Sequence, residues 1–508
     1  MLLVRSHGLR LVASAIVGLA LLVTAGCGRL RSGDGSGRDT GSSPQAAPLA
    51  VGKVAREQIR SGAQPANLVI CVLDAARADH VWSYGYPRET TPNIDKLAGE
   101  SVVFRNHFST YPSTKPSTAS LFTGLYPDTH RIMGGKTPDK SEVTLAQWLK
   151  GAGFHTAFFS SNAVASPEVG IGADFERIFV NPSAGGKARS EHISLSTSEA
   201  WRRPEGLTEV FGRWLSKEGR SRFFAYCHFL PPHNPYDAPE EVKAWFAAQE
   251  PIAVQRRSFE FPETRPAYGR DKALPPQEWV NWYDANMRWA DWGVGEVVRL
   301  LRERGLLDNT LLIVTSDHGE AFGEHGYIYH SHAVYDEFVH IPLVMRFPGK
   351  QRLVGEVTAL TQTVDLAPAI LDLWQIPYER ERIQGSSLLP LLTGEKRKVR
   401  DYVFATCSEP WPSYLVRDTA WSLLLYRGGK LRALYDLRND PGQTRNVIAE
   451  HAQTAAKMTA AFQQFARTQG RPLTEFTWSR AAAPATEAPQ GKLSEATRRE
   501  LKALGYLR

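Results

Sequence analysis

Acidic and histidine side chains follow two apolar runs that lie far apart in the sequence. Asp74 closes the run VICVLD, and Asp317 and His318 come directly after TLLIVT. Carboxylate oxygen and imidazole nitrogen together suit Zn²⁺ or Mn²⁺, whereas a set richer in oxygen favours Ca²⁺ or Mg²⁺. Taken alone, an Asp that ends a strand is more often a helix cap than a ligand. The combination indicates a divalent metal centre that only folding can assemble.

A histidine-rich stretch, GEHGYIYHSH, follows closely after the second acidic site. It contains His325, His330 and His332. A single histidine is more often a surface or core residue than a metal ligand. Three of them so near Asp317 and His318 strengthen the prediction of a metal site.

The motif TKPSTASLFTG, residues 114–124, carries a resemblance to a known family. It resembles the sulfatase signature C/S-x-P-S-R-x-x-L-x-T-G, in register from Pro116 and Ser117 to Gly124. The blocks SYGYPRETTPNIDKLAGESVVFRNHF, YDEFVHIPLVMRFPG and LYDLRNDPGQTRNV resemble the opening, middle and closing segments of sulfatases. The resemblance therefore covers nearly the whole mature chain. It implies the alkaline phosphatase superfamily, with a large mixed-sheet domain and a smaller C-terminal sheet domain.

Three positions depart from the sulfatase pattern. In sulfatases the first signature residue is a Cys or Ser that is converted to formylglycine, but here it is Thr114. The signature Arg is replaced by Thr118, and the paired Asp of the opening block is reduced to Asp74 followed by Ala75. Thr at this position resembles the phosphoethanolamine transferases and phosphatase-like members, in which the hydroxyl attacks phosphorus directly.

These features predict a metal-activated threonine nucleophile. A Thr hydroxyl is a poor nucleophile near neutral pH, and coordination to a divalent cation lowers its pKa. We expect one cation, Zn²⁺, Mn²⁺ or Ca²⁺, with a two-metal site as the alternative. The predicted ligands are Asp74, Thr114, Asp317, His318 and His330, with His332 as the alternative to His330.

An anionic ester also requires cationic or donor groups around its central atom. Lys115 follows Thr114 directly and is a candidate for contacting the ester. A solvated lysine on the protein surface is the alternative interpretation of Lys115, and the sequence favours neither. His233, in HFLPPHNPYD, resembles the substrate-contacting histidine of sulfatases. A proton for the leaving group would come from His228, His233 or His332. The predicted catalytic residues are Thr114, Lys115, His233 and His332.

The expected activity is hydrolysis of a sulfate or phosphate ester, with a glycan or a lipid head group as the substrate class. A phosphoethanolamine-type transferase acting on an envelope lipid or glycan is the first alternative, although no bundle of membrane helices precedes the domain. An inactive glycan-binding lipoprotein is the second alternative. A pure binding module has no chemical reason to keep a nucleophile beside a metal set, so we favour an enzyme.

The elements that must position these residues are predicted by apolar runs that alternate with helical stretches. The runs NLVICVLD, HTAFFS, FFAYCHF, TLLIVT and IPLVMR predict strands, and Leu145–Ala152 and Leu366–Leu373 predict helices. The pattern indicates an α/β fold with a large, mixed, mostly parallel sheet flanked by helices, whose strand ends collect functional residues. After Arg400, shorter runs and a helix over Val447–Gln469 predict a smaller antiparallel-sheet subdomain. The segment Pro276–Gly305 predicts a long helix, with Trp282, Trp289 and Trp292 as core residues.

The first residues predict export. Arg5 and Arg10 precede an apolar run that ends in LVTAGC, which resembles a bacterial lipoprotein signal with Cys27 as the acylated residue. An ordinary signal peptide or an uncleaved anchor is the alternative. We expect a lipoprotein of the cell envelope, on the outer membrane or facing the periplasm. The expected boundaries are 1–26 for the signal, 27–65 for a flexible tether, 66–397 for the catalytic domain and 398–508 for the C-terminal subdomain.

Composition excludes some other functions. A net charge of +7 over 508 residues is modest, and basic residues are scattered among acids, so nucleic-acid binding is not expected. Besides Cys27 there are three cysteines, an odd number, and two of them lie in apolar runs, so no disulfide framework is expected. Their wide separation excludes a compact cysteine metal motif. The short segment Arg480–Gln490 is rich in Ala and Pro and predicts a linker before a last short helix.

Overall fold

The computed structural model describes residues 65–132, 143–180, 198–219, 221–252, 276–349, 353–408, 413–426 and 430–469. The predicted export signal, Cys27, the tether up to residue 64, the linker and the last short helix lie outside these ranges. Within them, no helix combines the length and the apolar character that a membrane crossing requires.

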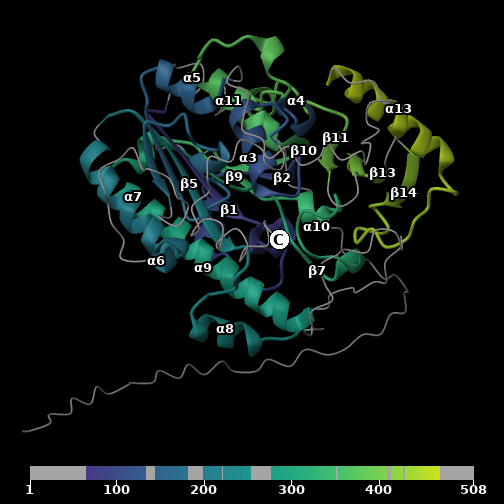
Figure 1. Ribbon diagram of the computed structural model, residues 1–508, viewed down its shortest axis with the longest axis horizontal. Helices are drawn as coiled ribbons and strands as arrows, with labels where there is room; N and C mark the ends of the chain where they lie inside the picture. The colour runs from purple at the N-terminus through teal and green to yellow at the C-terminus, as the bar shows by residue number, and fades with distance from the viewer. Residues whose placement is uncertain are drawn as a thin grey trace, which may run out of the picture. The chain divides into compact units, whose positions relative to one another are not determined.

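A mixed eight-stranded sheet forms the centre of the described chain (Figure 1). In spatial order its strands are β10 (Gly355–Gln362), β2 (Val102–Phe108), β9 (Leu343–Arg346), β6 (Thr310–Ser316), β1 (Asn67–Asp74), β5 (Phe223–Pro232), β3 (His155–Ser160) and β4 (Arg177–Val180). Strand β1 pairs in parallel with both β5 and β6, and β3 pairs in parallel with β5. Only β9 runs antiparallel to its neighbours within this sheet of the described chain. The predicted mostly parallel sheet is confirmed.

Helices cover both faces of this sheet because β1 is apolar on both sides. Leu68, Ile70 and Val72 of β1 pack into one core cluster, and the alternate residues pack into the other. The first face is covered by α3 (Thr114–Thr123), α5 (Leu145–Gly151), α11 (Leu366–Leu373) and α12 (Leu389–Leu392). The second face is covered by α2 (Pro92–Ala98), α6 (Ser198–Arg202), α7 (Pro204–Glu218) and α9 (Pro276–Glu303) (Figure 1). Three further helices of the described chain are α4 (Pro127–His130), α8 (Glu240–Ala247) and α10 (Asp336–Val339).

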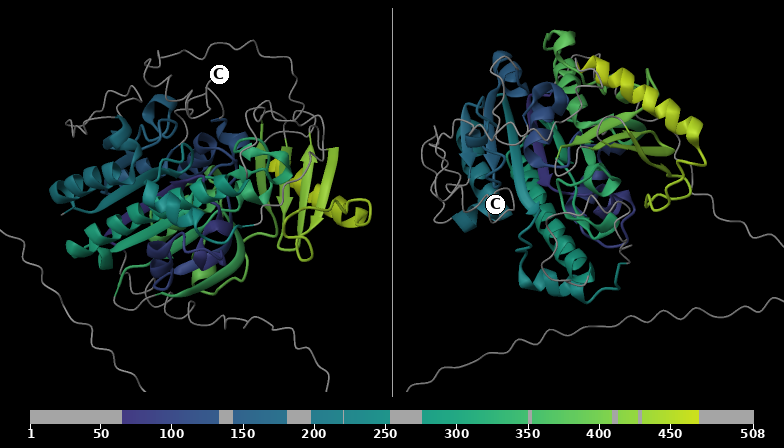
Figure 2. Two further views of the ribbon diagram at one scale, coloured as in Figure 1. Left: turned by 90° about the horizontal axis from the view of Figure 1, so that it is seen from below. Right: turned by 45° about the vertical axis from the view of Figure 1, so that its right-hand side comes forward.

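The C-terminal part forms the predicted antiparallel sheet with a packed helix. Its strands are β11 (Val403–Cys407), β12 (Ser413–Arg417), β13 (Trp421–Tyr426) and β14 (Lys430–Asp436). Helix α13 (Ala452–Thr468) lies against one face of this sheet through Met458 and Phe462 (Figure 2). The sequence prediction missed β14 and began the helix five residues too early.

The long predicted helix is present as α9, but its tryptophans do not all belong to the core. Trp289 is buried and Trp282 is partly buried, whereas Trp292 is 40% exposed. Positions 282 and 289 share one face of a helix with 3.6 residues per turn, and position 292 lies most of a further turn along and falls outside that face. The prediction of a core role was therefore wrong for Trp292.

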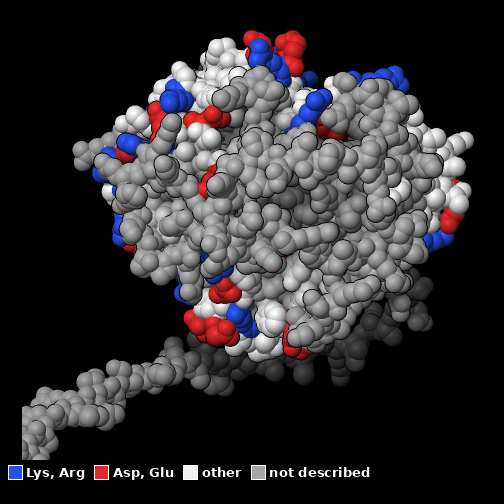
Figure 3. Space-filling view, viewed as in Figure 1, with Lys and Arg blue, Asp and Glu red and all other residues white. Residues whose placement is uncertain are grey.

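The described cysteines lie in the interior. Cys71, Cys227 and Cys407 are free and buried. On the face drawn in Figure 3, the visible Lys and Arg side chains of described residues lie among Asp and Glu side chains.

Candidate active site

Polar side chains meet where four adjacent parallel strands end. Asp74 is the last residue of β1, and Asp317 directly follows β6. His228 lies in β5, and Asn162 comes two residues after β3. Because β6, β1, β5 and β3 are neighbours in the sheet and parallel, their carboxyl ends share one edge. The fold thus brings together residues that are up to 243 positions apart.

Two buried carboxylates and two imidazoles form the centre of this cluster. Asp74 Oδ2 lies 3.0 Å from His228 Nε2, and Asp74 Oδ1 lies 3.4 Å from His318 Nε2. Asp317 Oδ2 is 3.6 Å from His318 Nε2 and 3.9 Å from His228 Nε2. The four side chains are at most 2% exposed. Such carboxylates need a compensating positive charge.

The backbone orients Asp317 toward the cluster. Its Oδ1 accepts hydrogen bonds from the backbone N–H groups of Ala75, at 3.1 Å, and His318, at 2.9 Å. Its Oδ2 is buried and has no hydrogen-bond partner among the described residues. Burying a carboxylate oxygen without a hydrogen-bond partner destabilises the fold unless a cation binds that oxygen.

Thr114 lies at the same edge, as the first residue of α3. Its Oγ1 is 3.4 Å from Asp74 Oδ1 and 3.2 Å from His318 Nε2, and the residue is fully buried. Helix α3 is anchored to the end of β6 one turn later, where Ser117 Oγ donates to the carbonyl oxygen of Asp317. The alcohol, the carboxylates and the imidazole predicted from the sequence are therefore neighbours in space.

In both His318 and His228, the ring nitrogen Nδ1 has a hydrogen-bond partner, which leaves Nε2 to face the carboxylates. His318 Nδ1 is 2.9 Å from the carbonyl oxygen of Gly319, which can only accept, so Nδ1 carries a hydrogen and Nε2 is the ring nitrogen that faces the cluster. His228 Nδ1 lies 3.0 Å from the hydroxyl of Tyr226. Burial alone would lower the pKa of His228, but the hydrogen bond and charge of Asp74 raise it above its usual value.

Asp74 is held in its charged form. Burial alone would raise the pKa of this carboxyl, but His233, together with the hydrogen bond from His228, brings it well below its usual range. The side-chain amide of Asn162 donates a further hydrogen bond to Asp74 Oδ2. The Oδ1 of Asn162 accepts from the backbone N–H of Val164 at 2.7 Å, which fixes the orientation of the amide.

The donor set fits a divalent cation. Ligand atoms of Asp74, His228 and Asp317 all lie within 4.8 Å of one another. Two buried carboxylates with imidazole nitrogen are a usual environment for such an ion. Asp74 and Asp317 were predicted as ligands, whereas His228 was considered only as a proton donor. The sequence feature that could have indicated a ligand role for His228 is its position near the end of the predicted strand FFAYCHF.

His330 and His233 lie beside this cluster. The His330 ring stacks on His318 with centroids 4.5 Å apart, and His233 is 4.7 Å from His330. Nearby, Glu320 Oε1 is 3.6 Å from His330 Nδ1, and Glu320 Oε2 accepts from the hydroxyl of Tyr236 at 2.6 Å. The ligand role of His330 and the catalytic role of His233 stay predictions. Glu320, Tyr236 and Asn162 were not singled out from the sequence.

The other predicted residues have different surroundings. Lys115 is 7% exposed and so is not a solvated surface lysine, and burial lowers its pKa to about 8. His332 lies 6.2 Å from the ring of Tyr327, and burial lowers its pKa to about 4. His325 instead bonds Glu337 and the backbone of Gln443, which takes both of its nitrogens away from the cluster.

Two family models match the chain. The model described as Sulfatase matches residues 66–376, and the model described as N-sulphoglucosamine sulphohydrolase, C-terminal, matches residues 323–468. Together they cover the eight-stranded sheet and the C-terminal four-stranded sheet.

Curated relatives include sulfatases of bacteria. The chain is 26% identical to the ulvan-active sulfatase of Formosa agariphila over 342 residues, which is 64% of this chain and 65% of that protein. It thus spans less than two thirds of the length of that relative. It is 25% identical to an arylsulfatase of Clostridium perfringens over 75% of this chain and 90% of the relative.

Solved structures share the fold. A protein in complex with its substrate D-glucosamine-2-N,6-O-disulfate gives a TM-score of 0.67 at 19% identity, covering 80% of this chain and 98% of the other. The phosphonate monoester hydrolase of Agrobacterium radiobacter gives 0.65 at 22% identity, covering 80% and 96%. With a family model that matches more than half of its length, the chain belongs to the sulfatase family of ester hydrolases.

Proposed function

We propose that this chain hydrolyses a sulfate or phosphate ester of a glycan or lipid head group, with Thr114 as the nucleophile and a divalent cation as cofactor. The observation that carries the proposal is the position of Thr114 Oγ1, 3.4 Å from Asp74 and 3.2 Å from His318 at the start of α3. An alcohol in this place has both a charged carboxylate and an imidazole nitrogen beside it.

The residues that would hold the cation are Asp74, Asp317, His228 and His318, with Thr114 at its side. A divalent cation supplies positive charge that favours the deprotonated form of a nearby hydroxyl. Asn162 and Tyr226 would orient two of the ligands through their hydrogen bonds to Asp74 and His228.

Thr114 would attack the sulfur or phosphorus atom of the ester and displace the alcohol, and water would then cleave the sulfo- or phospho-threonine, releasing sulfate or phosphate and restoring the hydroxyl. The first backbone N–H groups of α3 point toward this end of the helix, where the helix dipole favours negative charge. Lys115 is the adjacent residue and adds a positive charge when protonated. These donors support an ester centre that keeps its negative oxygens during the reaction.

The leaving oxygen requires a proton. His228 has both nitrogens in hydrogen bonds, with Asp74 and with Tyr226, which argues against this role. His332 is neutral near pH 7 because burial lowers its pKa to about 4. His233 is the remaining candidate, since its Nδ1 is bonded to the carbonyl oxygen of Asn234 while its ring lies beside His330 and His318.

A panel of aryl esters tests the proposal. Purified protein is incubated with an aryl sulfate, a phosphate monoester, a phosphate diester and a phosphonate, each with Zn²⁺, Mn²⁺ or Ca²⁺. We expect cation-dependent release of the alcohol from at least one ester. In ¹⁸O-labelled water, hydrolysis places the label in the released sulfate or phosphate, whereas transfer to another alcohol does not. Cation-loaded protein that cleaves none of these esters would contradict the proposal.

We also propose that the chain is exported and acylated at Cys27, on the basis of the sequence LVTAGC. Two acyl chains give the stable anchoring that a single chain does not. In a bacterial host, Cys27→Ser should move the protein from the membrane fraction to the soluble fraction. An unchanged distribution would reject the anchor.

A further inference from the structure

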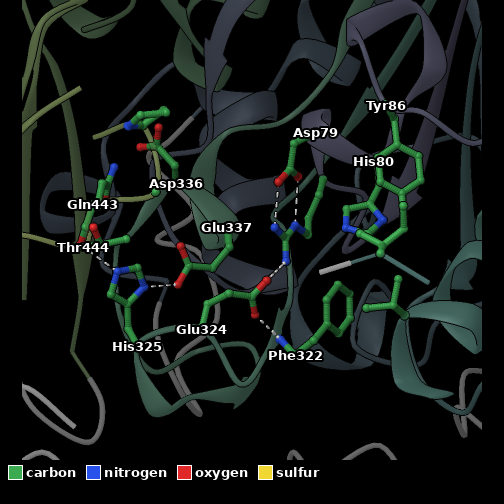
Figure 4. A pocket seen from close by; sticks show the side chains of 15 residues that line it. Asp79, His80, Tyr86, Phe322, Glu324, His325, Asp336, Glu337, Gln443 and Thr444 are labelled. Carbon is green, nitrogen blue, oxygen red and sulfur yellow. Dashed lines mark hydrogen bonds and ion pairs between the residues drawn. The ribbon is translucent and has the colours of Figure 1, made fainter. Parts of the chain in front are cut away.

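The short strands β7 (Ala321–Phe322) and β8 (Ile328–Tyr329) form a hairpin that leads directly into His330. The turn of this hairpin is held by two ion pairs of 2.7 Å each, one made by Glu324 and one by His325. Both residues line a pocket that none of the proposed catalytic residues lines (Figure 4). Because the turn is fixed in this way, the backbone just before His330 can be kept in a strained conformation.

Tyr329, the last residue of the hairpin, has a backbone conformation that tyrosine seldom adopts. Its φ is +67°, in the left-handed region, where the Cβ atom of any residue other than glycine comes too close to the backbone. Glycine adopts this conformation without that cost. A chain that needed only the turn would therefore be better served by glycine at position 329. The side chain of Tyr329 must contribute something that offsets the strain.

The ring of Tyr329 is supported on one side and remains partly accessible. Trp279, at the start of α9, lies with its ring centroid 5.3 Å from that of Tyr329, at an interplanar angle of 33°. Trp279 itself is buried, whereas Tyr329 is only partly buried. The tyrosine ring is thus held by a second aromatic ring, and part of its surface is free to contact a bound molecule.

Tyr329 lies beside the proposed ester site. It directly precedes His330, whose ring centroid is 4.7 Å from that of His233, the proposed proton donor to the leaving oxygen. Burial raises the pKa of Tyr329, and the charge of the nearby Glu320 carboxylate raises it further. Glu320 Oε1 is in turn 3.6 Å from His330 Nδ1. The accessible part of the tyrosine ring is therefore on the side of the site where the leaving alcohol would lie.

We propose that Tyr329 is a specificity-determining residue that stacks against a leaving alcohol with a flat ring, which is a sugar or an aryl group. This inference rests on the proposed ester hydrolysis. The face of a tyrosine ring matches the flat face of either kind of ring. An open-chain alcohol, such as the head group of a phospholipid, offers no such face. Of the two substrate classes proposed above, the site therefore favours the glycan.

Calorimetric titration measures this preference without turnover. Full-length, cation-loaded Thr114→Ala protein is titrated with phenyl, D-glucose-6 and ethyl esters, each as the sulfate and as the phosphate. At least one ring ester should bind about fivefold or more tightly than the ethyl ester of the same anion, which is the gain expected from one aromatic stack. The ring ester with the larger gain identifies the ring as a sugar or an aryl group.

Tyr329→Gly, made in the same background, is the decisive variant. It removes the ring at a position whose φ suits glycine, so the fold should be retained. It should bind the ring ester about fivefold more weakly and the ethyl ester as before. Tyr329→Phe keeps the ring and should keep the preference. Tyr378→Ala, which breaks another tyrosine–tryptophan pair, with Trp148 of α5, should leave every affinity unchanged.

Three results would overturn the inference: no binding of any ring ester, an unchanged ring preference in Tyr329→Gly, or equal weakening of ring and ethyl esters. The last result would mean that Tyr329 supports only the fold. Turnover of the wild type in the ester panel is a separate measurement. Cleavage without an effect of Tyr329 on ring binding rejects this inference alone, whereas ring binding that depends on Tyr329 without any cleavage rejects the proposed hydrolysis alone.

Discussion

At the scale of single residues, Thr114 makes the most direct prediction. The residue is fully buried, its hydroxyl has Asp74 and His318 as neighbours at the cluster, and it belongs to none of the apolar core clusters, so losing the hydroxyl and one methyl group has a small effect on the fold. Thr114→Ala should reduce turnover by on the order of 10³-fold or more, with a Tm close to that of the wild type. Thr114→Ser keeps the oxygen and should retain a measurable part of the activity. A wild-type rate for Thr114→Ala would remove Thr114 from the mechanism.

Asp317 offers a test of the cation site itself. In Asp317→Asn the amide oxygen can keep the hydrogen bonds from Ala75 and His318, while the amide nitrogen replaces Oδ2, which faces the cluster. The fold should survive, and the affinity for a divalent cation should fall by about tenfold or more because a charged ligand is lost. Elemental analysis after dialysis measures this loss. Asp401→Asn, at an exposed position, should keep the wild-type metal content.

At the scale of elements, helix α5 is stabilised by a capping box at its N-terminus. Thr144 Oγ1 accepts from the backbone N–H of Gln147, and the side chain of Gln147 accepts from the backbone of Thr144. Thr144→Ala should lower the free energy of unfolding by about 1 kcal/mol, as measured by urea denaturation. Thr144→Ser retains the cap oxygen and serves as the control. Turnover should be unchanged in both variants, since α5 contributes no residue to the cluster.

The elements also show what the sequence could predict. Apolar runs identified β1, β3, β5, β6 and β9, and an acid at the end of such a run singled out Asp74 and Asp317, which the structure brings into one cluster. The order of strands is set by pairings between distant segments, which a local pattern does not contain. For this reason the antiparallel direction of β9, the place of His228 beside Asp74 and Asp317 and the contact of Asn162 with Asp74 could not be derived. Strand β14 was missed because its apolar residues, in KLRALYD, are interrupted by Lys430 and Arg432 and give no continuous apolar run.

At the scale of the whole molecule, a buried ion pair joins the C-terminal part to the large sheet. Arg400 precedes β11 and pairs with Asp365, which is fully buried at the start of α11. The same guanidinium bonds Tyr126 and Gln362. Arg400→Leu would leave Asp365 as an unpaired buried charge and should lower the free energy of unfolding by about 3 to 5 kcal/mol.

Denaturant unfolding of Arg400→Leu measures this loss. Lys398→Leu, which breaks an exposed pair with Asp401, is the matched control and should cost less than about 1 kcal/mol. Equal stability of the two variants would mean that the buried pair does not hold the two parts together.

His325 connects the same two parts through a group that titrates. Burial alone would lower its pKa, but Glu337 raises it from the ordinary 6.5 to about 9. The pKa of His325 is therefore higher in the folded chain than in the unfolded chain. The stability that the His325–Glu337 pair contributes is fully present below about pH 6.5 and is lost as the pH rises through 9. The difference in unfolding free energy between the wild type and His325→Gln should therefore be larger at about pH 6 than at about pH 9.5. A difference that grows with pH would contradict the ion pair.

The four strands that end at the cluster make the centre sensitive to how the sheet is assembled. A slip of one residue in β1 or β6 would move its terminal acid by about 3.3 Å and turn it to the opposite face. Such a chain would keep most of its apolar contacts, so spectroscopic probes of compactness would hardly register the error. Turnover therefore reports correct strand alignment, and the inactive fraction of a refolded preparation measures how often alignment fails.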